Sequence, residues 1–414
     1  MDAIQKIKGF ADILPPESGA FVRLENQARR IFGLYGYKEA RLPILERTEL
    51  FARSIGEETD VVQKEMYTFP DRKGRSLTMR PEATAGVVRA YVENGLHARE
   101  ELTKLFCAGP MFRYERPQKG RMRQFHQINV EALGSSSPLL DAEVIFMLAQ
   151  FLTELGIADL NFELNSLGCP ECRPAYLAAL NEYFRGFDAG SLCEDCMRRK
   201  LTNPLRVLDC KAPGCRELTR TAPLIADYQC PACREHFDAV RGLLDADGFA
   251  YTINPRLVRG LDYYTRTTFE VTSGKIGAQS AVAGGGRYDG LVKALGGPDL
   301  PAIGFACGME RLAMLMPDGE PQAPDFFLAA MGEASLNSGL LLTQRLRREG
   351  FCGECALAGK SAKSQMRQAA KSGARFCLIV GDAELEAGTA QVKNMVTGVQ
   401  ESVGQADLTQ YLRK

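Results

Sequence analysis

The sequence predicts an α+β fold with a cysteine-rich insertion and a separate C-terminal α/β module. Two strand-like segments, residues 103–113 and 124–133, flank a charged loop of about ten residues, which suggests an antiparallel pair with a functional loop. Eight of the thirteen cysteines lie between residues 168 and 240, a stretch that looks inserted. Beyond the Pro- and Gly-containing linker Pro317–Pro324, strand and helix patterns alternate.

Length and composition limit the class of protein. A chain of 414 residues exceeds one typical core, so two or three domains are expected. Its 45% hydrophobic residues argue against disorder, and its balanced charge, 51 basic and 51 acidic residues, neither indicates nor excludes a nucleic-acid partner. The best candidate for a membrane segment, Val144–Leu152, is too short and contains Gln150, and residues 1–16 lack the apolar region of a secretory signal. A cytoplasmic protein with no membrane segment is expected.

The elements before the insertion follow from hydrophobic periodicity. Helical spacing of apolar residues predicts a helix over 17–35, and 66–69 and 76–79 flank a turn-rich segment typical of a hairpin. A helix over 82–93 ends at Asn94-Gly95. Two further elements are a short strand over 38–45 and an apolar helix over 138–155.

After the insertion, strand patterns return at 256–271 and 280–282, followed by a helix over 309–316. The last module has predicted strands at 326–331, 376–380 and 391–396, and predicted helices at 336–348, 361–372 and 407–412. We therefore expect a core domain from 1–167 and 241–319, an insertion domain over 168–240, and a C-terminal domain over 324–414.

Two segments resemble known nucleotide-site motifs but lack residues that those motifs require. Gly359-Lys360-Ser361 resembles the end of a P-loop, but the position of its first glycine is Glu354, whose carboxylate would repel phosphate. Residues 360–364 resemble the K-M-S-K-S loop of class I synthetases, but none of the three histidines lies in the His-x-Gly-His context that this chemistry requires.

Four separated segments combine arginine, carboxylate, glycine and aromatic residues: Met79–Thr84, Phe112–Glu131, Leu257–Tyr264 and Gly304–Leu312. Several of these charges interrupt apolar strand or helix patterns. Such charges are costly unless they are paired or contact a ligand. A structural ion pair is the alternative for any one of them, but four such segments together favour a common site.

These segments resemble histidyl-tRNA synthetases of the bacterial type over nearly the whole chain. Phe112-Arg113 with the following basic loop resembles the second class II signature, and Gly308–Leu312 resembles the third. Pro43 lies where the proline of the first is expected, and the start of the chain, Lys8–Pro15, also matches. Two segments are similar to ones typical of the histidine-specific family, namely Arg259–Tyr264 and Ala283–Asp289.

The resemblance implies an antiparallel sheet core flanked by helices, a C-terminal anticodon-binding domain and a homodimer. It implies ATP-dependent activation of L-histidine to histidyl-adenylate and transfer to tRNA(His), with release of AMP and diphosphate. Mg²⁺ is expected on the triphosphate, held largely by phosphate oxygens and water. No protein nucleophile is needed, because positioning and charge neutralisation drive the first step.

The family pattern assigns the ATP-binding residues. Arg113 is expected on the α-phosphate, and Arg121 and Arg311 on the remaining phosphates, because a guanidinium binds phosphate with two parallel hydrogen bonds. Glu115 is expected near the adenine or its metal. Arg259 is expected to bridge the histidine carboxylate and the α-phosphate, which makes Arg259 and Arg113 the expected catalytic pair.

The same pattern assigns the histidine-binding residues. Glu131 and Tyr264 are expected to bracket the two imidazole nitrogens, since a carboxylate on one ring nitrogen fixes the tautomer. Tyr263 is expected to line the pocket. The residues expected around the α-amino group are Glu82, Ala83, Thr84 and Gln127.

Contacts with tRNA are expected from basic residues. In the family the loop over 116–123 meets the acceptor end, which makes Arg116 and Arg123 candidates; a solvated basic loop is the alternative. In the C-terminal module the candidates for phosphate contact are Lys360, Lys363, Arg367, Lys371 and Lys393, each of which is otherwise an ordinary surface cation.

The glycines at 284–286 have two interpretations, a tight turn or a close approach of backbone to substrate. We favour the close approach, since Gly304 and Gly308 suggest the same crowding.

The insertion carries four close cysteine pairs, a spacing typical of tetrahedral Cys₄ zinc sites. The pairs are Cys169/Cys172, Cys193/Cys196, Cys210/Cys215 and Cys230/Cys233. Many members of the family lack these thiols, so spacing alone supports a structural Zn²⁺. Two sites, or one site plus spare thiols, both fit, and free or redox-active thiols are the alternative. The lone pair Cys352/Cys355 is interpreted as structural.

Two other functions fit parts of the sequence. A regulatory subunit of ATP phosphoribosyltransferase has a similar core, but such subunits generally lack the C-terminal module and parts of the histidine-binding segments. A non-catalytic tRNA-binding module leaves the ATP site unexplained.

Overall fold

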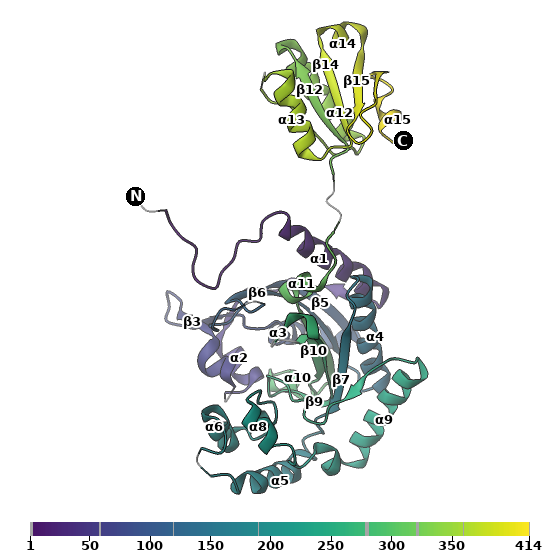
Figure 1. Cartoon of the computed structure of the whole chain (residues 1–414). Helices are drawn as coiled ribbons and strands as arrows, with labels where there is room; N and C mark the ends of the chain where they lie inside the picture. Colours follow the sequence, from purple (N-terminus) through teal and green to yellow (C-terminus); the bar gives the residue numbers. More distant parts are fainter. Residues whose placement is uncertain are drawn as a thin grey trace. The chain divides into compact units, whose positions relative to one another are not determined.

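The computed structural model describes residues 3–57, 59–118, 120–188, 190–277, 281–319, 323–358 and 360–413. The chain divides into two compact units, Met1–Asp318 and Gly319–Lys414 (Figure 1). Lys119, Ser280, residues 320–322 of the expected linker, and Gly359 of the rejected P-loop lie outside the described residues. Within the described ranges, no helix has the length and apolar character needed to cross a bilayer.

The first unit is organised around an eight-stranded sheet with an antiparallel interior. Its spatial order is β1 (Lys38–Glu39), β5 (Thr103–Phe112), β6 (Gln124–Leu133), β11 (Ala302–Gly308), β10 (Ala281–Arg287), β9 (Thr265–Ser273), β7 (Leu160–Ser166) and β8 (Thr252–Ile253). Only the short edge strands β1 and β8 pair in parallel with their neighbours. The predicted α+β class with an antiparallel core is confirmed, including the pair on either side of the charged loop.

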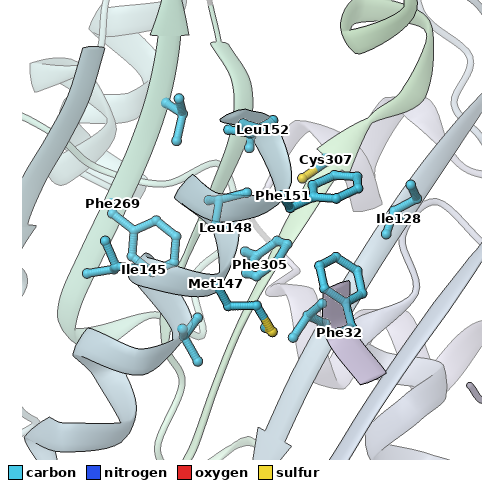
Figure 2. Close-up of a cluster of buried hydrophobic side chains, with 14 of the residues drawn as sticks. Phe32, Ile128, Ile145, Met147, Leu148, Phe151, Leu152, Phe269, Phe305 and Cys307 are labelled. Carbon is cyan, nitrogen blue, oxygen red and sulfur yellow. The ribbon is translucent and has the colours of Figure 1, made fainter. Parts of the chain in front are cut away.

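One face of this sheet forms the main apolar core. Along β6, Ile128, Val130 and Ala132 are fully buried in this core, as are Ile303, Phe305 and Cys307 along β11. Helices α1 (Glu17–Leu34), α4 (Pro138–Glu154) and α9 (Pro231–Ala246) contribute the other side. Figure 2 shows Phe32 of α1 and Met147, Leu148 and Phe151 of α4 gathered around Phe305. Strand periodicity leaves the intervening positions of the sheet facing the other way.

A smaller layer precedes the long strands. Strands β2 (Leu45–Arg47), β4 (Ser76–Met79) and β3 (Tyr67–Pro70) form a three-stranded sheet beside helices α2 (Thr48–Ile55) and α3 (Thr84–Glu93). The predicted hairpin is confirmed. The strand predicted over 38–45 is wrong in its middle, because residues 40–44 form an irregular connection from β1 of one sheet to β2 of the other. The helix predicted from Glu82 begins at Thr84, since the Glu82 carboxylate accepts hydrogen bonds from the first free backbone N–H groups.

The insertion is a cluster of short helices between β7 and α9. They are α5 (Arg173–Arg185), α6 (Glu194–Thr202), α7 (Leu205–Leu208) and α8 (Pro213–Leu218), around an apolar core of their own (Figure 1). Helix α9 starts at the last cysteine pair and returns to the main core through Val240 and Leu244.

The strand predicted over 256–271 is wrong in its first half, since β9 starts only at Thr265. Residues 254–264 form an irregular segment, which we call the recognition loop. Val258 and Tyr264 of this loop are buried in the insertion core, so the apolar residues that suggested a strand serve packing in a loop.

The second unit has one five-stranded mixed sheet. The order is β13 (Gly353–Cys355), β12 (Phe326–Met331), β14 (Phe376–Gly381), β15 (Thr389–Asn394) and β16 (Gln400–Gly404). The helices are α12 (Glu333–Arg348), α13 (Ala362–Ser372), α14 (Asp382–Ala387) and α15 (Leu408–Leu412). All six predicted elements of this module are present with small shifts of their ends, whereas β13, β16 and α14 were not predicted.

Candidate functional site

The sheet face opposite the main core forms the floor of a cleft of about 470 Å³. Gln127, Asn129 and Glu131 alternate along β6 with the apolar residues that face the helices, so all three point into the cleft. On the neighbouring strand the corresponding positions are Gly304, Ala306 and Gly308. This face is therefore lined by polar and very small residues, which leaves space above the sheet for a ligand.

The cleft brings together most of the residues that the sequence singled out. Its walls include Glu82, Thr84, Arg113, Glu115, Arg121, Gln127, Glu131, Arg259, Tyr263, Tyr264 and Arg311. Ala83 is buried in an apolar cluster with Val87 and does not line the cleft. Arg116 is exposed outside the cleft, and Arg123 stacks on the Tyr114 ring at 3.8 Å from its centroid.

Two arginines of the cleft are held by backbone carbonyls, and a third is held by a carboxylate. Arg113 Nε donates to Pro81 O at 2.9 Å, and Arg311 Nη1 donates to Ala281 O at 2.6 Å. Arg121 pairs with Glu115 at 2.6 Å. Burial, followed by repulsion from Arg121 and Arg113, lowers the pKa of Arg311. Mutual repulsion of half-buried guanidinium groups shows that this end of the cleft suits a polyanion.

Arg259 lines the same cleft. Its Nη1 pairs with Glu270 of β9 at 2.5 Å, and its guanidinium lies 5.7 Å from the centre of the Tyr264 ring. Gly284 stands opposite, where a Cβ atom would collide with the Arg259 guanidinium. The absent side chain at Gly284 is thus what admits Arg259 to the cleft.

The end of the cleft near β6 is polar but shielded from water. Glu131 is 1% exposed, accepts a hydrogen bond from Thr84 Oγ1 at 2.6 Å, and is hydrogen-bonded by Tyr288 Oη. Burial raises the pKa of the Glu131 carboxyl to about 8, with a further increase from Glu82 and opposition from the two hydrogen bonds. A buried carboxyl beside two hydroxyls is suited to a small polar ring that can both donate and accept protons.

This end of the cleft is lined by further polar and aromatic groups. Among the described residues, the buried Oε1 of Gln127 and Oδ1 of Asn129 have no hydrogen-bond partner within the protein, although buried polar atoms are rarely left so. The Tyr263 ring packs 4.7 Å from Tyr264 and 5.5 Å from Tyr288. Unsatisfied acceptors at an aromatic-lined end indicate a polar ligand.

The glycine segment is part of a strand, so the tight-turn interpretation is wrong. Gly284–Gly286 lie in β10, and Cβ atoms at Gly285 and Gly286 would strike the backbone of the adjacent strands. The crowding is therefore against the protein itself. Gly304 is crowded in the same way, by the Glu131 carboxylate and Val130 O. Gly308 is not crowded, since a Cβ there would make only ordinary contacts.

Several lining residues escaped sequence reasoning. Three contacts were not expected from the sequence. Tyr288 donates to Glu131, Glu270 pairs with Arg259, and Glu310 accepts from the backbone N–H of His126. Glu270 had a usable signal, because it is a charge within the apolar pattern of β9. Arg199 and Arg206 reach the cleft from the insertion, and nothing in their local pattern pointed there.

The eight cysteines of the insertion form two groups of four. The outer thiol cluster is Cys169, Cys172, Cys230 and Cys233, and the inner thiol cluster is Cys193, Cys196, Cys210 and Cys215. This arrangement corresponds to the two-site alternative. The lone pair Cys352/Cys355 belongs to neither group. All thirteen cysteines lie in the described ranges, and none forms a disulfide.

The spacing of the sulfurs fits metal coordination. Cys169 Sγ lies 3.6 Å from Cys172 Sγ and 3.9 Å from Cys230 Sγ. Cys193 Sγ lies 3.8 Å from Cys210 Sγ. A tetrahedral Zn²⁺ with bonds of about 2.3 Å separates its sulfurs by about 3.8 Å, whereas a disulfide requires about 2.05 Å. In both clusters a backbone N–H also donates to a sulfur, Cys230 N to Cys172 and Cys193 N to Cys215, each at 3.2 Å.

Comparison with known proteins gives a consistent result. Residues 9–312 match the family described as "Histidyl-tRNA synthetase", and residues 326–414 match "Anticodon binding domain". The histidine–tRNA ligase of Solidesulfovibrio magneticus is 66% identical over 100% of this chain and 98% of its own length. That of Geobacter sulfurreducens is 54% identical over 97% of each.

Solved structures agree with the sequence relatives. The apo histidyl-tRNA synthetase of S. aureus has a TM-score of 0.84 at 36% identity. The match covers 100% of this chain and 100% of that one. A Bacillus halodurans protein described as an ATP phosphoribosyltransferase regulatory subunit/histidyl-tRNA synthetase has a TM-score of 0.68 at 18% identity, covering 92% of this chain and 99% of that one, which shows the fold alone.

Proposed function

The chain belongs to the histidyl-tRNA synthetase family, and we propose that its cleft activates L-histidine with ATP by means of Arg113, Arg259 and Arg311 around the phosphates and Glu131 on the imidazole. As a member of this family it forms histidyl-adenylate and charges tRNA(His), releasing AMP and diphosphate. One observation carries the assignment of residues. Guanidinium groups from three distant segments meet in one cleft that ends in a buried carboxyl.

In the first step the histidine carboxylate attacks the α-phosphorus of ATP, and the bond to the diphosphate leaving group breaks. Arg259, which lines the cleft beside Glu270 and the Tyr264 ring, is proposed to bind the attacking carboxylate and the α-phosphate together. Arg113 stabilises the charge that develops on the α-phosphate, and Arg121 and Arg311 hold the remaining phosphates. Glu115 keeps Arg121 oriented through their ion pair, in addition to its expected place near the adenine or its metal.

Recognition of histidine uses the closed end of the cleft. Glu131 and Tyr264 meet the two imidazole nitrogens, and Tyr263 covers the ring. The α-amino group lies near Glu82, Thr84 and the Gln127 Oε1 that lacks a protein partner. A substrate without two ring nitrogens would leave these buried groups unpaired, which is the physical basis of rejection.

In the second step a terminal ribose hydroxyl of tRNA(His) attacks the adenylate carbonyl, and AMP leaves. Arg116 and Arg123, on the loop after β5, are the proposed contacts for the acceptor end. The C-terminal unit, which matches the anticodon-binding family, is proposed to bind the anticodon with help from Lys363, Arg367 and Lys371 on α13. We place the reaction in the cytoplasm, with a homodimer as the active form.

Two kinds of metal ion fit this assignment. Mg²⁺ on the triphosphate neutralises phosphate charge and requires few protein ligands, because phosphate oxygens and water supply most of its shell. Each thiol cluster is proposed to hold one Zn²⁺. Its role is structural, since four thiolates leave no open coordination position.

Histidine-dependent exchange of pyrophosphate into ATP tests the proposed function. We expect exchange that requires histidine, together with histidine acceptance by tRNA(His). A preparation that binds ATP yet shows no histidine-dependent exchange would exclude the proposed enzymatic activity. It would then favour the function of a regulatory subunit.

Metal analysis of protein purified without chelator tests the thiol clusters. We expect about two zinc ions per chain. Fewer than about half a zinc per chain would contradict the proposed metal sites.

A further inference from the structure

The recognition loop carries three of the proposed substrate-binding residues but has no regular secondary structure. It leaves β8 at Ile253 and joins β9 at Thr265, with Arg259, Tyr263 and Tyr264 in between. The catalytic core contacts its backbone through Asn254 N to Leu164 O at 2.9 Å, Asn165 Nδ2 to Leu257 O at 3.0 Å and Asp262 N to Ile55 O at 3.1 Å. An irregular segment of this length needs other contacts to keep a single conformation.

The insertion supplies those contacts along the length of the loop. Arg206 Nη1 donates to Arg259 O at 2.7 Å, and Asn203 Nδ2 donates to Asp262 Oδ1 at 2.8 Å. At the start of the loop, Arg256 Nη2 donates to Thr219 O of the insertion at 2.6 Å.

At the end of the loop, Arg173 donates to Tyr264 O. The backbone on both sides of the proposed substrate contacts is thus fixed by insertion residues.

The loop also shares the apolar core of the insertion. Val258 and Tyr264 are 7% and 8% exposed and pack in the same cluster as Leu180, Phe184 and Val207. Tyr263 lies against this cluster as well. If the insertion loses its core packing, the recognition loop loses the surface on which it rests.

Each polar contact lies close in sequence to a thiol. Arg173 directly follows Cys172, Thr219 comes four residues after Cys215, and Asn203 and Arg206 lie between Cys196 and Cys210. Cys196 and Cys215 are themselves buried in the shared apolar core. Domains of this size rarely stabilise themselves by hydrophobic burial alone, and bound metal commonly supplies the difference.

We infer that Zn²⁺ in the two thiol clusters fixes the recognition loop and thereby sets the affinity of the cleft for histidine. The polyphosphate end is held by Pro81 and Ala281 carbonyls of the catalytic core, so ATP affinity is much less dependent on the metals. This inference rests on the proposed function, because it concerns the histidine end of the same cleft.

The first experiment removes a metal and measures the two substrates separately. Zinc content and the dissociation constants for histidine and ATP, by equilibrium dialysis, are compared between the full-length protein and Cys193→Ser/Cys196→Ser. We expect loss of about one zinc per chain and histidine binding weaker by at least about tenfold, with ATP binding within about threefold. Cys352→Ser/Cys355→Ser is the matched control, because that pair lies in the C-terminal unit and joins neither cluster; it should match the wild type.

A second variant guards against general misfolding. Asn203→Ala/Arg206→Ala removes two loop contacts and leaves all eight thiols, so it should keep both zinc ions and still weaken histidine binding about tenfold. Unchanged histidine affinity in this variant, or in a cysteine variant shown to have lost zinc, would overturn the inference. A wild-type protein without zinc would overturn it as well. Wild-type protein that lacks histidine-dependent exchange would instead refute the proposed function.

Discussion

The two ends of the cleft are supported in different ways. At the phosphate end, Arg113 and Arg311 donate to carbonyls of Pro81 and Ala281, within the same unit that forms the large sheet. At the histidine end, the loop that carries Arg259 is held by side chains and apolar packing of the insertion. The phosphate end depends on the core, whereas the histidine end combines Glu131 and Gln127 of the sheet with a loop held by an added helical cluster with two thiol groups.

This difference separates two tasks. Binding of triphosphate requires cations at fixed positions, and here backbone carbonyls of the core orient Arg113 and Arg311. Recognition of one amino acid requires a closed pocket around its side chain, and here a loop on a separate support supplies the lid. Changes at the insertion are therefore expected to alter histidine recognition before they alter phosphate binding.

Arg259 joins the two ends, and its loss should have the largest effect. We expect Arg259→Ala to lower the rate of histidine-dependent exchange by about 10²–10³-fold and to weaken histidine binding more than ATP binding. Arg113→Ala should lower the rate similarly but leave histidine binding nearly unchanged. Steady-state kinetics and dialysis measure this, with Arg185→Ala on the insertion surface as control. A loss below about tenfold for Arg259→Ala would mean that it does not bridge the substrates.

Glu131 should affect the histidine end alone. Glu131→Gln keeps the shape of the side chain but not its charge or proton, so we expect kcat/KM for histidine to fall about 10²-fold with little change in ATP binding. The control is Glu143→Gln. Glu143 lies on α4 and pairs with Lys104 of β5, and this variant should behave like the wild type. If Glu131→Gln weakened the binding of histidine and of ATP equally, the division of the cleft into two ends would be contradicted.

Gly304 tests how closely the floor fits Glu131. A Cβ at this position would overlap the Glu131 carboxylate and Val130 O, so Gly304→Ala should destabilise the fold by about 1–3 kcal/mol and displace Glu131. Gly19→Ala is the control, because no atom lies within 4 Å of the added Cβ; alanine in helix α1 should be neutral or stabilising by up to about 1 kcal/mol. Chemical denaturation measures the free energy of unfolding of both variants. An unchanged value for Gly304→Ala would show that the strands move apart to accept the added Cβ atom.

The smallest expected effect is on the pH dependence of stability. Burial raises the pKa of Glu131 from its ordinary 4.5 to about 8 in the folded protein without ligand. Between these values the folded state holds a proton that the unfolded state has released, so stability falls as pH rises from about 4.5 to about 8. Glu131→Gln should remove this contribution and raise Tm by a few degrees near pH 8 but not near pH 4. An identical pH profile for the two proteins would contradict the raised pKa.

The parts of this design that repeat along the chain were predictable from sequence. The alternation of Gln127, Asn129 and Glu131 with apolar neighbours, and the cysteine pairs at metal-like spacing, are local patterns that survive folding. The loop conformation of residues 256–264 could not be predicted, because its apolar residues pack against helices of the insertion that are far away in sequence. Tyr288 on Glu131 and Arg206 on Arg259 are likewise contacts between distant residues, which no local period encodes.

A crystal structure of the full-length protein with a non-hydrolysable histidyl-adenylate analogue tests the division of the cleft most directly. The imidazole is expected against Glu131 and Tyr264, and the phosphate between Arg113 and Arg259, with the recognition loop held against the insertion as described above. An analogue bound with its ring away from Glu131, or a recognition loop detached from the insertion while the ligand is in place, would contradict the account.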